Sequence, residues 1–404
     1  MKLKKIYAVL MPVLMLFAGC VPAELQLREL PQDPAAPVTV AALLPLTGSN
    51  RIYAEQMKEG ILAAESRINN FNGISNRRLQ VIFCDTKGTD AGTLAALAEA
   101  EKHHAVAAIA GYSTQEVSAI IAHADHLQMP MVIPLATSDY HVQSSAFVYR
   151  NCFSDLQQME VLAHYLLFWR KLDSGAVIND QNGDAEYSRG ICRNFIQVMR
   201  DLNCSVTGEI TVRPGKELQE EEIKSLLMAD PGFIMIAASG KRAAKMIKQI
   251  RNAGFTGFLC GPESWDDQEL TSALKNFNPG ECIFTAFFDP ANKSREFREF
   301  SGEFRKRFFH NPGACETQSY DAMIFLAIGL QNARNLFDFD RNWRQIKGFT
   351  GAAADYTMLK KGAVDRTIYL KRFSVERLTD SVTPRPVVTK KMQYSKLQDY
   401  KIIE

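Results

Sequence analysis

The sequence predicts an α/β protein made of two lobes of similar construction. From Val38 onward, short apolar runs rich in β-forming residues alternate with longer stretches of helical period, which is typical of a mostly parallel sheet covered by helices. One such series runs from residue 38 to about residue 151, and a comparable series runs from about residue 174 to residue 286. Two similar series favour two lobes over one large sheet.

The strands are expected at the apolar runs and the helices in the stretches between them. Within residues 57–68, and again within residues 117–127, apolar side chains recur at helical spacing. More helix and a β-like tail follow the second series. The expected strands are Val38–Leu44, Leu79–Cys84, Val106–Ala110, Met131–Ile133, Ala176–Ile178, Phe233–Ala237 and Phe258–Cys260.

Each expected strand ends in a turn that leads into a helix. In parallel sheets of this kind, ligands bind beyond the carboxyl ends of the strands, where helix N-termini present unpaired N–H groups. We therefore expect the functional residues in these turns. The turns are residues 45–53, 111–115, 134–140, 180–187, 238–242 and 261–267.

Residues 1–19 have the pattern of a signal peptide, with a basic start, an apolar stretch over residues 6–17 and small residues before Cys20. The apolar stretch is too short to span a bilayer, which takes roughly 20 apolar residues. The ending Leu16–Cys20 resembles the bacterial lipobox, which implies that Cys20 is lipidated and that the proline-rich residues 20–37 form a tether. The alternative is an ordinary secretory signal that happens to be cleaved before a cysteine. We expect an extracytoplasmic protein that is lipid-anchored to a bacterial membrane.

The composition argues against several classes of function. The 404 residues include 47 basic and 45 acidic side chains, and this near-neutral balance predicts no nucleic-acid partner. The seven cysteines other than Cys20 have no zinc-site spacing, so we interpret most of them as buried structural residues. We expect no metal ion and no cofactor.

No catalytic motif is present in the sequence. There is no Gly-x-Ser-x-Gly elbow, and Gly240-Lys241-Arg242 is not a phosphate-binding loop because Arg242 stands where Ser or Thr is needed. Residues 180–184 look like part of a calcium loop, but the glycine is misplaced. We therefore expect no enzyme and no catalytic residues.

Short motifs in the turns resemble, in their order and spacing, the branched-chain amino-acid (Leu/Ile/Val) binding family of type I periplasmic receptors, the solute-binding proteins of ABC importers. The resemblance extends from Val38 to about Phe373. The motifs that carry it are Leu46-Thr47-Gly48, Tyr53, Gly60, Ile68-Asn69, Asn72-Gly73-Ile74, Gly111-Tyr112-Ser113-Thr114, Ile133-Pro134-Leu135-Ala136-Thr137, Asp180, Tyr187, Arg251-Asn252-Ala253-Gly254, Gly261-Pro262-Glu263 and Tyr320-Asp321-Ala322.

The resemblance implies two Rossmann-like lobes that are joined by three crossovers and close on a ligand about a hinge. The crossovers are expected near Phe153, Ala286 and Phe337. The first lobe is then residues 38–153 plus 287–336, the second is 154–286 plus 337–380, and 381–404 form a C-terminal tail. The implied partners are a small-molecule ligand and an ABC permease.

The resemblance also implies which residues bind the ligand. Tyr53 and Tyr187 correspond to pocket aromatics, although either could be an ordinary surface residue. Glu263 corresponds to the carboxylate that receives a ligand ammonium; the alternative is a solvated loop glutamate. The turn hydroxyls and the loop at the end of the 131–133 strand correspond to the ligand-carboxylate site, and they are Ser113, Thr114, Ala136 and Thr137.

Two features keep alternatives open. Ser113 to Glu116 form a capping box, so Ser113 could simply cap a helix. The tyrosine-rich turn of the family is replaced here by Ala238-Ser239-Gly240, Arg51 lies beside a pocket loop, and Asp266 and Asp267 follow Trp265. These departures leave the identity of the ligand side chain open.

The leading hypothesis is a lipoprotein that binds a small amino acid or related solute for an ABC permease, and its rival is a non-transport sensor or envelope-interaction lipoprotein on the same fold.

Overall fold

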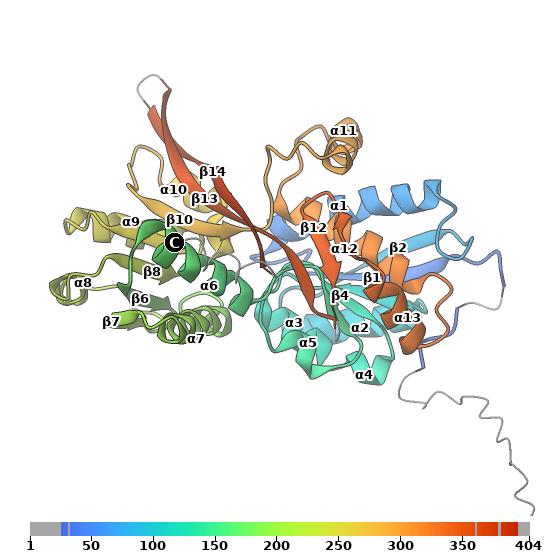
Figure 1. Cartoon of the computed structure of the whole chain (residues 1–404). Helices are drawn as coiled ribbons and strands as arrows, with labels where there is room; N and C mark the ends of the chain where they lie inside the picture. Colours follow the sequence, from blue (N-terminus) through green and yellow to red (C-terminus); the bar gives the residue numbers. More distant parts are fainter. Residues whose placement is uncertain (1–25, 31–32, 360–361, 379–380, 395–404) are drawn as a thin grey trace, which may run out of the picture.

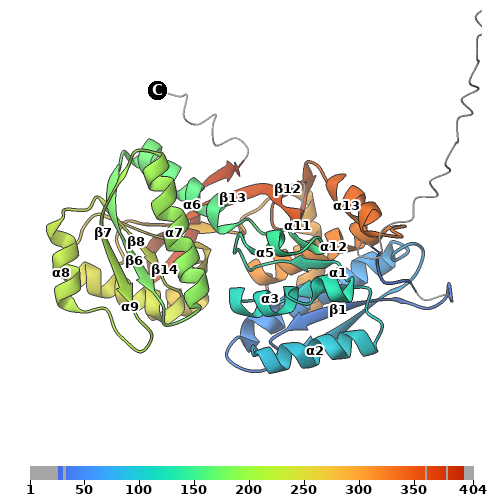
Figure 2. The same ribbon diagram turned by 90° about the horizontal axis from the view of Figure 1, so that it is seen from below.

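The computed structural model describes residues 26–30, 33–359, 362–378 and 381–394. The predicted signal peptide and Cys20 lie outside the described residues. Within the described ranges, no helix is both long enough and apolar enough to cross a membrane. Figures 1 and 2 show two α/β lobes side by side, as the sequence predicts.

The first lobe is built on a parallel sheet of order β2-β1-β3-β4-β5. The helices α1 and α12 pack together on one face of this sheet, and α2 and α3 cover the other (Figure 2). Most of β1 is buried because both faces are covered, which explains why all of its residues except Thr39 are apolar. The elements are β1 (Val38–Leu44), α1 (Arg51–Asn70), β2 (Leu79–Asp85), α2 (Asp90–Lys102), β3 (Ala107–Ala110), α3 (Thr114–Ile121), α4 (Ala124–Leu127), β4 (Met131–Ile133), α5 (His141–Ser144) and β5 (Val148–Arg150).

The second lobe has a parallel core of order β10-β9-β8-β6-β7, with α7 on one face and α8 and α9 on the other. Figure 1 shows this lobe in green and yellow. Its elements are α6 (Asp155–His164), a π-helical turn (Tyr165–Trp169), β6 (Ser174–Asp180), α7 (Ala185–Asp201), β7 (Ser205–Val212), α8 (Glu220–Met228), β8 (Phe233–Ala237), α9 (Gly240–Asn252), β9 (Phe258–Gly261), a 3-10 turn (Glu263–Trp265), α10 (Gln268–Ala273) and β10 (Cys282–Ala286).

The last third of the chain returns to the first lobe and then rejoins the second sheet. Helix α12 lies so close to α1 that a Cβ on Gly60 would meet the Glu316 carbonyl oxygen at 2.1 Å, so this contact requires glycine. In α13, Trp343 packs on Tyr149 of β5. The long strand β13 then pairs antiparallel with β10. The elements are α11 (Arg295–Phe308), α12 (Ala314–Leu330), α13 (Leu336–Arg344), β11 (Phe349–Thr350), β12 (Asp355–Met358), β13 (Val364–Leu378) and β14 (Ser381–Gln393).

Arg366, which is fully buried on β13, connects the segments that pass between the lobes. Its guanidinium donates to the carbonyl oxygen of Asn151 at 3.2 Å and to that of Phe287, so it binds the chain near two of the expected crossovers. Phe153 and Phe287 stack at 4.3 Å beside it. Arg366 also donates to Gln318 Oε1, and the Tyr356 hydroxyl contacts both Gln318 and Asp321. We call Gln318, Asp321, Tyr356 and Arg366 the crossover cluster.

The fold class predicted from the sequence is confirmed, and the predicted strands match β1, β4 and β8 residue for residue. Strands β5, β7 and β10 were not predicted. The seven cysteines other than Cys20 are all free thiols, and all but the partly exposed Cys315 are buried, as expected for structural residues. The lobe boundaries stay a prediction.

Candidate functional site

Tyr53 lies where the first turn of α1 meets the second lobe. Its hydroxyl donates to Asp267 Oδ1 at 3.2 Å, a contact between the lobes. Its ring stacks flat on that of Tyr112, with centroids 4.6 Å apart and planes inclined by 5°. Burial and the neighbouring Asp267 raise the pKa of Tyr53 well above its usual value, so the phenol stays neutral and donates.

Ser113 and Thr114 begin α3, and both are engaged within the protein. The Ser113 hydroxyl accepts the N–H of Glu116 at 3.2 Å, which is the capping alternative considered above. The Thr114 N–H donates at 3.0 Å to Asp184 Oδ2 of the second lobe. Asp184 also caps α7 by accepting the Tyr187 N–H at 3.0 Å. A protein carboxylate therefore lies at the helix end where the sequence placed a ligand carboxylate.

Ala136 and Thr137 form the loop after β4. Arg150 fixes this loop by donating to the carbonyl oxygen of Thr137 at 3.0 Å and to that of Ser138. Both loop residues are buried. Within the described part of the chain, Thr137 Oγ1 has no hydrogen-bond partner. A buried hydroxyl in this state is destabilising by itself and is available to a ligand.

Tyr187 and Glu263, two of the residues that the resemblance assigned to the ligand, contact each other in the second lobe. The Tyr187 hydroxyl donates to Glu263 Oε1 at 2.8 Å, and the Glu263 N–H donates to Gln158 Oε1 at 3.2 Å. The other carboxylate oxygen, Oε2, is buried and finds no partner among the described residues. Burial raises the pKa of Glu263 to about 7, while the hydrogen bond from Tyr187 lowers it.

Asp155, at the start of α6, is a site residue that sequence reasoning missed. Its N–H donates to the carbonyl oxygen of Thr137 at 2.8 Å, which joins α6 to the Thr137 loop. Burial, and then the charge of Glu263, raise the pKa of its carboxyl to about 8. No ion pair to Asp155 or Glu263 forms within the described residues. We call Thr137, Asp155, Tyr187 and Glu263 the inter-lobe cluster.

A second carboxylate contact between the lobes mirrors that of Asp184. Asp139, in the loop after β4, accepts the Leu156 N–H at 3.1 Å and the Asn194 side-chain amide at 2.8 Å. Leu156 lies in the first turn of α6 and Asn194 lies in α7. Each lobe thus places a carboxylate at a helix N-terminus of the other, where the helix dipole favours negative charge.

The departures from the family motifs have visible structural roles. Trp265 is fully buried and donates through its indole N–H to the Ala238 carbonyl oxygen at 3.2 Å, so it supports the turn that lacks the tyrosines. Asp266 pairs with Lys371 at 2.6 Å, and Arg51 is exposed. Arg242 binds Asp180 with a 2.9 Å hydrogen bond, which gives both the Gly240–Arg242 segment and Asp180 a structural partner.

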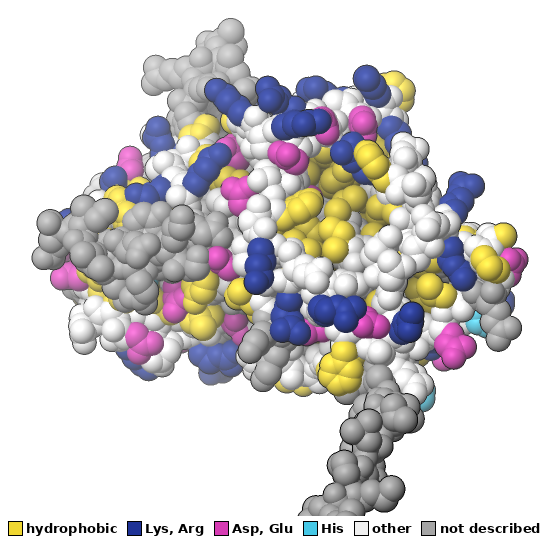
Figure 3. Space-filling model, turned by 45° about the vertical axis from the view of Figure 1, so that its right-hand side comes forward, with side chains coloured by type: hydrophobic (Ala, Val, Ile, Leu, Met, Phe, Trp, Pro, Cys, Tyr) yellow, Lys and Arg dark blue, Asp and Glu magenta, His cyan; other side chains and the backbone are white. Residues whose placement is uncertain are grey.

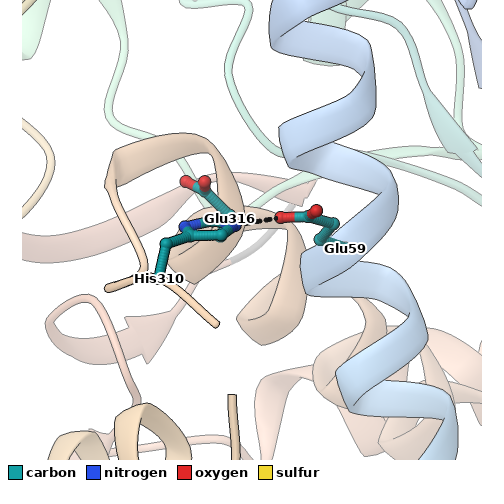
Figure 4. A group of neighbouring side chains, drawn as sticks. All are labelled: Glu59, His310 and Glu316. Carbon is teal, nitrogen blue, oxygen red and sulfur yellow. Dashed lines mark hydrogen bonds and ion pairs between the residues drawn. The ribbon is translucent and has the colours of Figure 1, made fainter. Parts of the chain in front are cut away.

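Glu59, His310 and Glu316 form a group with metal-ligand side chains outside the inter-lobe cluster, on α1 and α12 and in the loop before α12 (Figure 4). His310 Nε2 contacts Glu59 Oε2 at 2.8 Å, and Nδ1 contacts the Asn311 carbonyl oxygen at 3.0 Å. Burial lowers the pKa of His310, but these two acceptors outweigh burial and raise it. A protonated histidine satisfies both acceptors, so the arrangement is explained without a metal ion.

Figure 3 shows Lys and Arg side chains interspersed with Asp and Glu side chains over the face in view, around a hollow with hydrophobic side chains. This mixture is consistent with the near-neutral composition.

Comparisons with known proteins agree with the fold. The model of a family described as periplasmic binding protein matches residues 37–373. The Leu/Ile/Val-binding protein BraC3 of Rhizobium johnstonii is 30% identical over 75% of this chain and 81% of its own length. The Leu/Ile/Val-binding protein homolog 3 of Brucella melitensis is 25% identical over 62% of this chain and 67% of its own length. A leucine-binding protein of Thermotoga maritima, whose crystal structure is known, has a TM-score of 0.72 at 22% identity and covers 87% of this chain and 98% of its own.

Proposed function

This chain belongs to the periplasmic binding protein family, among the branched-chain amino-acid binding receptors, and on that premise we propose that it binds a small amino acid or related solute between its lobes and delivers it to an ABC permease. Family members are substrate-binding proteins of transporters and not enzymes, which agrees with the absence of a catalytic motif in the sequence.

One observation carries the proposal. Thr137 of the first lobe and Glu263 of the second each bury a polar side-chain oxygen that has no partner in the described residues. Buried polar groups are almost always hydrogen-bonded, and each exception calls for an explanation such as a missing ligand. A ligand with an N–H-bearing cation, placed between the lobes, would satisfy the Glu263 oxygen.

The experiment that tests the proposal is a thermal-shift screen of the purified protein against amino acids, amides, amines and small carboxylates. A ligand that binds only the folded state stabilises it by about 2.7 kcal/mol at a hundredfold excess over Kd. We expect at least one nitrogen-bearing solute to raise the melting temperature. A screen in which no solute raises it would contradict the proposal.

Delivery to a permease has its own test, because the rival function, sensing, also requires a ligand. With the permease reconstituted in vesicles, the liganded protein should stimulate ATP hydrolysis and solute uptake. Stimulation of neither by the liganded protein would favour the sensor hypothesis.

We also propose that Cys20 carries a lipid anchor and that the protein works outside the cytoplasm. The lipobox-like ending Leu16–Cys20 supports this. Replacing Cys20 by serine should abolish incorporation of labelled fatty acid and release the protein from the membrane fraction. Unchanged labelling of Cys20→Ser would contradict the anchor.

A further inference from the structure

At the start of α3, a protein carboxylate already occupies the place that the resemblance implied for a ligand carboxylate. At the start of α3, the Thr114 N–H is bound to Asp184, and the Glu116 N–H is bound to the Ser113 hydroxyl. Helix N-termini bind anions through such N–H groups, so a ligand carboxylate would have to displace a protein carboxylate. At α3 it would also lie against the charge of Asp184.

The same region has an excess of carboxyl groups over basic groups. Asp155, Asp184, Glu263 and Asp267 all lie at or beside the boundary between the lobes, and none of them forms an ion pair in the described residues. The neighbouring cation, Arg150, donates instead to the carbonyl oxygens of Thr137 and Ser138. Buried charge without a partner is unfavourable, so a cation placed here would be bound strongly.

Tyrosine side chains border these carboxylates. The stacked pair of Tyr53 and Tyr112 belongs to the first lobe, and the Tyr53 hydroxyl contacts Asp267. Tyr187 of the second lobe contacts Glu263. Aromatic faces attract organic cations, and ammonium-binding sites combine them with carboxylates.

We propose that the solute bound by this protein is an organic ammonium ion without a carboxylate beside its ammonium group, and that Asp184 takes the place of that carboxylate. The inference rests on the proposed solute-binding function and specifies the class of solute. Glu263 and Asp155 receive the ammonium, and the tyrosines face it. Thr137 is left to accept from or donate to the rest of the solute.

The test is calorimetric titration of the purified protein with matched pairs of compounds. Each amino acid is paired with the amine that lacks only its carboxylate: valine with isobutylamine, leucine with isopentylamine, phenylalanine with phenethylamine and lysine with 1,5-diaminopentane. For the wild type, we expect the best amine to bind at least ~10-fold more tightly than its matched amino acid, because like charges placed against each other are strongly unfavourable.

Asp184→Ser tests the role assigned to Asp184. Serine still caps α7 but no longer reaches the start of α3, so the Thr114 N–H becomes free for a ligand carboxylate. We expect this variant to lose at least ~10-fold of the preference for the amine, mainly because the amino acid binds more tightly. Asp139→Ser is the matched control, since it removes the other carboxylate contact between the lobes and should keep the preference.

The outcomes separate the two proposals. A wild type that prefers the amino acid over the matched amine overturns this inference but supports solute binding. Equal loss of preference in Asp184→Ser and Asp139→Ser also overturns it, because the effect would then come from loosened lobes. A protein that binds no amine and no amino acid, in the wild type or either variant, overturns both the inference and the proposed function.

Discussion

The crossover cluster and the inter-lobe cluster are both buried groups of polar side chains, but only one of them is complete. In the crossover cluster, Asp321 accepts the N–H groups of Ala352 and Ala353 at 2.8 Å and the Tyr356 hydroxyl at 2.9 Å, while Arg366 donates to Gln318 at 2.6 Å. In the inter-lobe cluster, one oxygen each of Thr137 and Glu263 lacks a partner among the described residues.

This difference indicates what each cluster does. Paired buried groups hold the fold, because removing one of them leaves the others without partners. Buried groups that have no partner in the protein can be satisfied by a bound ligand. The crossover cluster should therefore control stability, and the inter-lobe cluster should control ligand binding.

The largest effect is expected for Arg366→Met. Truncation leaves Gln318 and the carbonyl oxygens of Asn151 and Phe287 without their donor, and breaking a buried charged network is destabilising by about 3–5 kcal/mol. Chemical denaturation should show this loss of unfolding free energy. Arg372→Met, an exposed position on the same strand, is the control. If both variants unfold alike, the crossover cluster does not control stability.

Glu263→Gln should weaken ligand binding without lowering stability, in contrast to Arg366→Met. The neutral amide keeps the size of the side chain and can still accept from Tyr187, but it removes the buried charge that a ligand ammonium would pair with. Loss of such a partner costs about 2–5 kcal/mol, so the affinity of the best-bound amine should fall roughly thirtyfold or more. The unfolding free energy should stay the same or rise. Glu269→Gln, exposed on α10, should leave affinity unchanged, and wild-type affinity in Glu263→Gln would exclude it as the ammonium partner.

The pH dependence of stability should reveal the carboxyls of the inter-lobe cluster. Burial raises the pKa of Glu263 to about 7 and that of Asp155 to about 8 in the folded state, above their values in the unfolded chain. The folded state then holds more protons, so its stability falls as pH rises through these values. His141, whose pKa burial lowers to about 3, is neutral in both states above its usual pKa.

We therefore expect the free protein to lose stability as the pH rises from 6.5 to 8.5. Glu263 should account for on the order of 1 kcal/mol of this loss. Denaturation of wild type and Glu263→Gln across this range measures that share as a difference. If the stability of the wild type changes with pH in the same way as that of Glu263→Gln, the raised pKa of Glu263 is contradicted.

The smallest effect is expected for Thr137→Val, which removes one neutral hydroxyl without changing the shape of the side chain. Affinity for the best-bound solute should fall by roughly 0.5–1 kcal/mol, the value of one neutral hydrogen bond. The fold should be as stable as before, because the hydroxyl has no partner in the described residues of the free protein. Titration and denaturation of this variant decide whether the hydroxyl serves the ligand. A loss of stability would show a structural role instead.

The sequence predicted the elements whose pattern is local. Strands β4 and β8 are continuous apolar runs and β1 is apolar except for Thr39, and Ser113 caps α3 as its capping box indicated. Strand β7 was missed because it lies at the edge of the core sheet and alternates exposed and buried residues, including Thr207 and Glu209.

The site was only partly predictable, because it is made by contacts between residues that are far apart in the sequence. Tyr187 and Glu263 followed from the family resemblance, and their contact spans 76 positions in the chain. Asp184 reaches Thr114 over 70 positions, and no local pattern marks it as more than a turn residue. Asp155 looked like an ordinary first-turn acid of a helix, because its burial depends on how the two lobes meet.

The most direct test of the central claim, that unpaired carboxyls between the lobes receive a cationic solute, is the proton balance of binding. Calorimetric titration at pH 7 of the best-bound amine, in two buffers of different ionisation enthalpy, measures the protons exchanged. Because burial raises the pKa of Glu263 to about 7 in the free protein, binding of an ammonium ion should release protons from the wild type and fewer from Glu263→Gln. Binding with no proton release, or with equal release from both proteins, would contradict the claim.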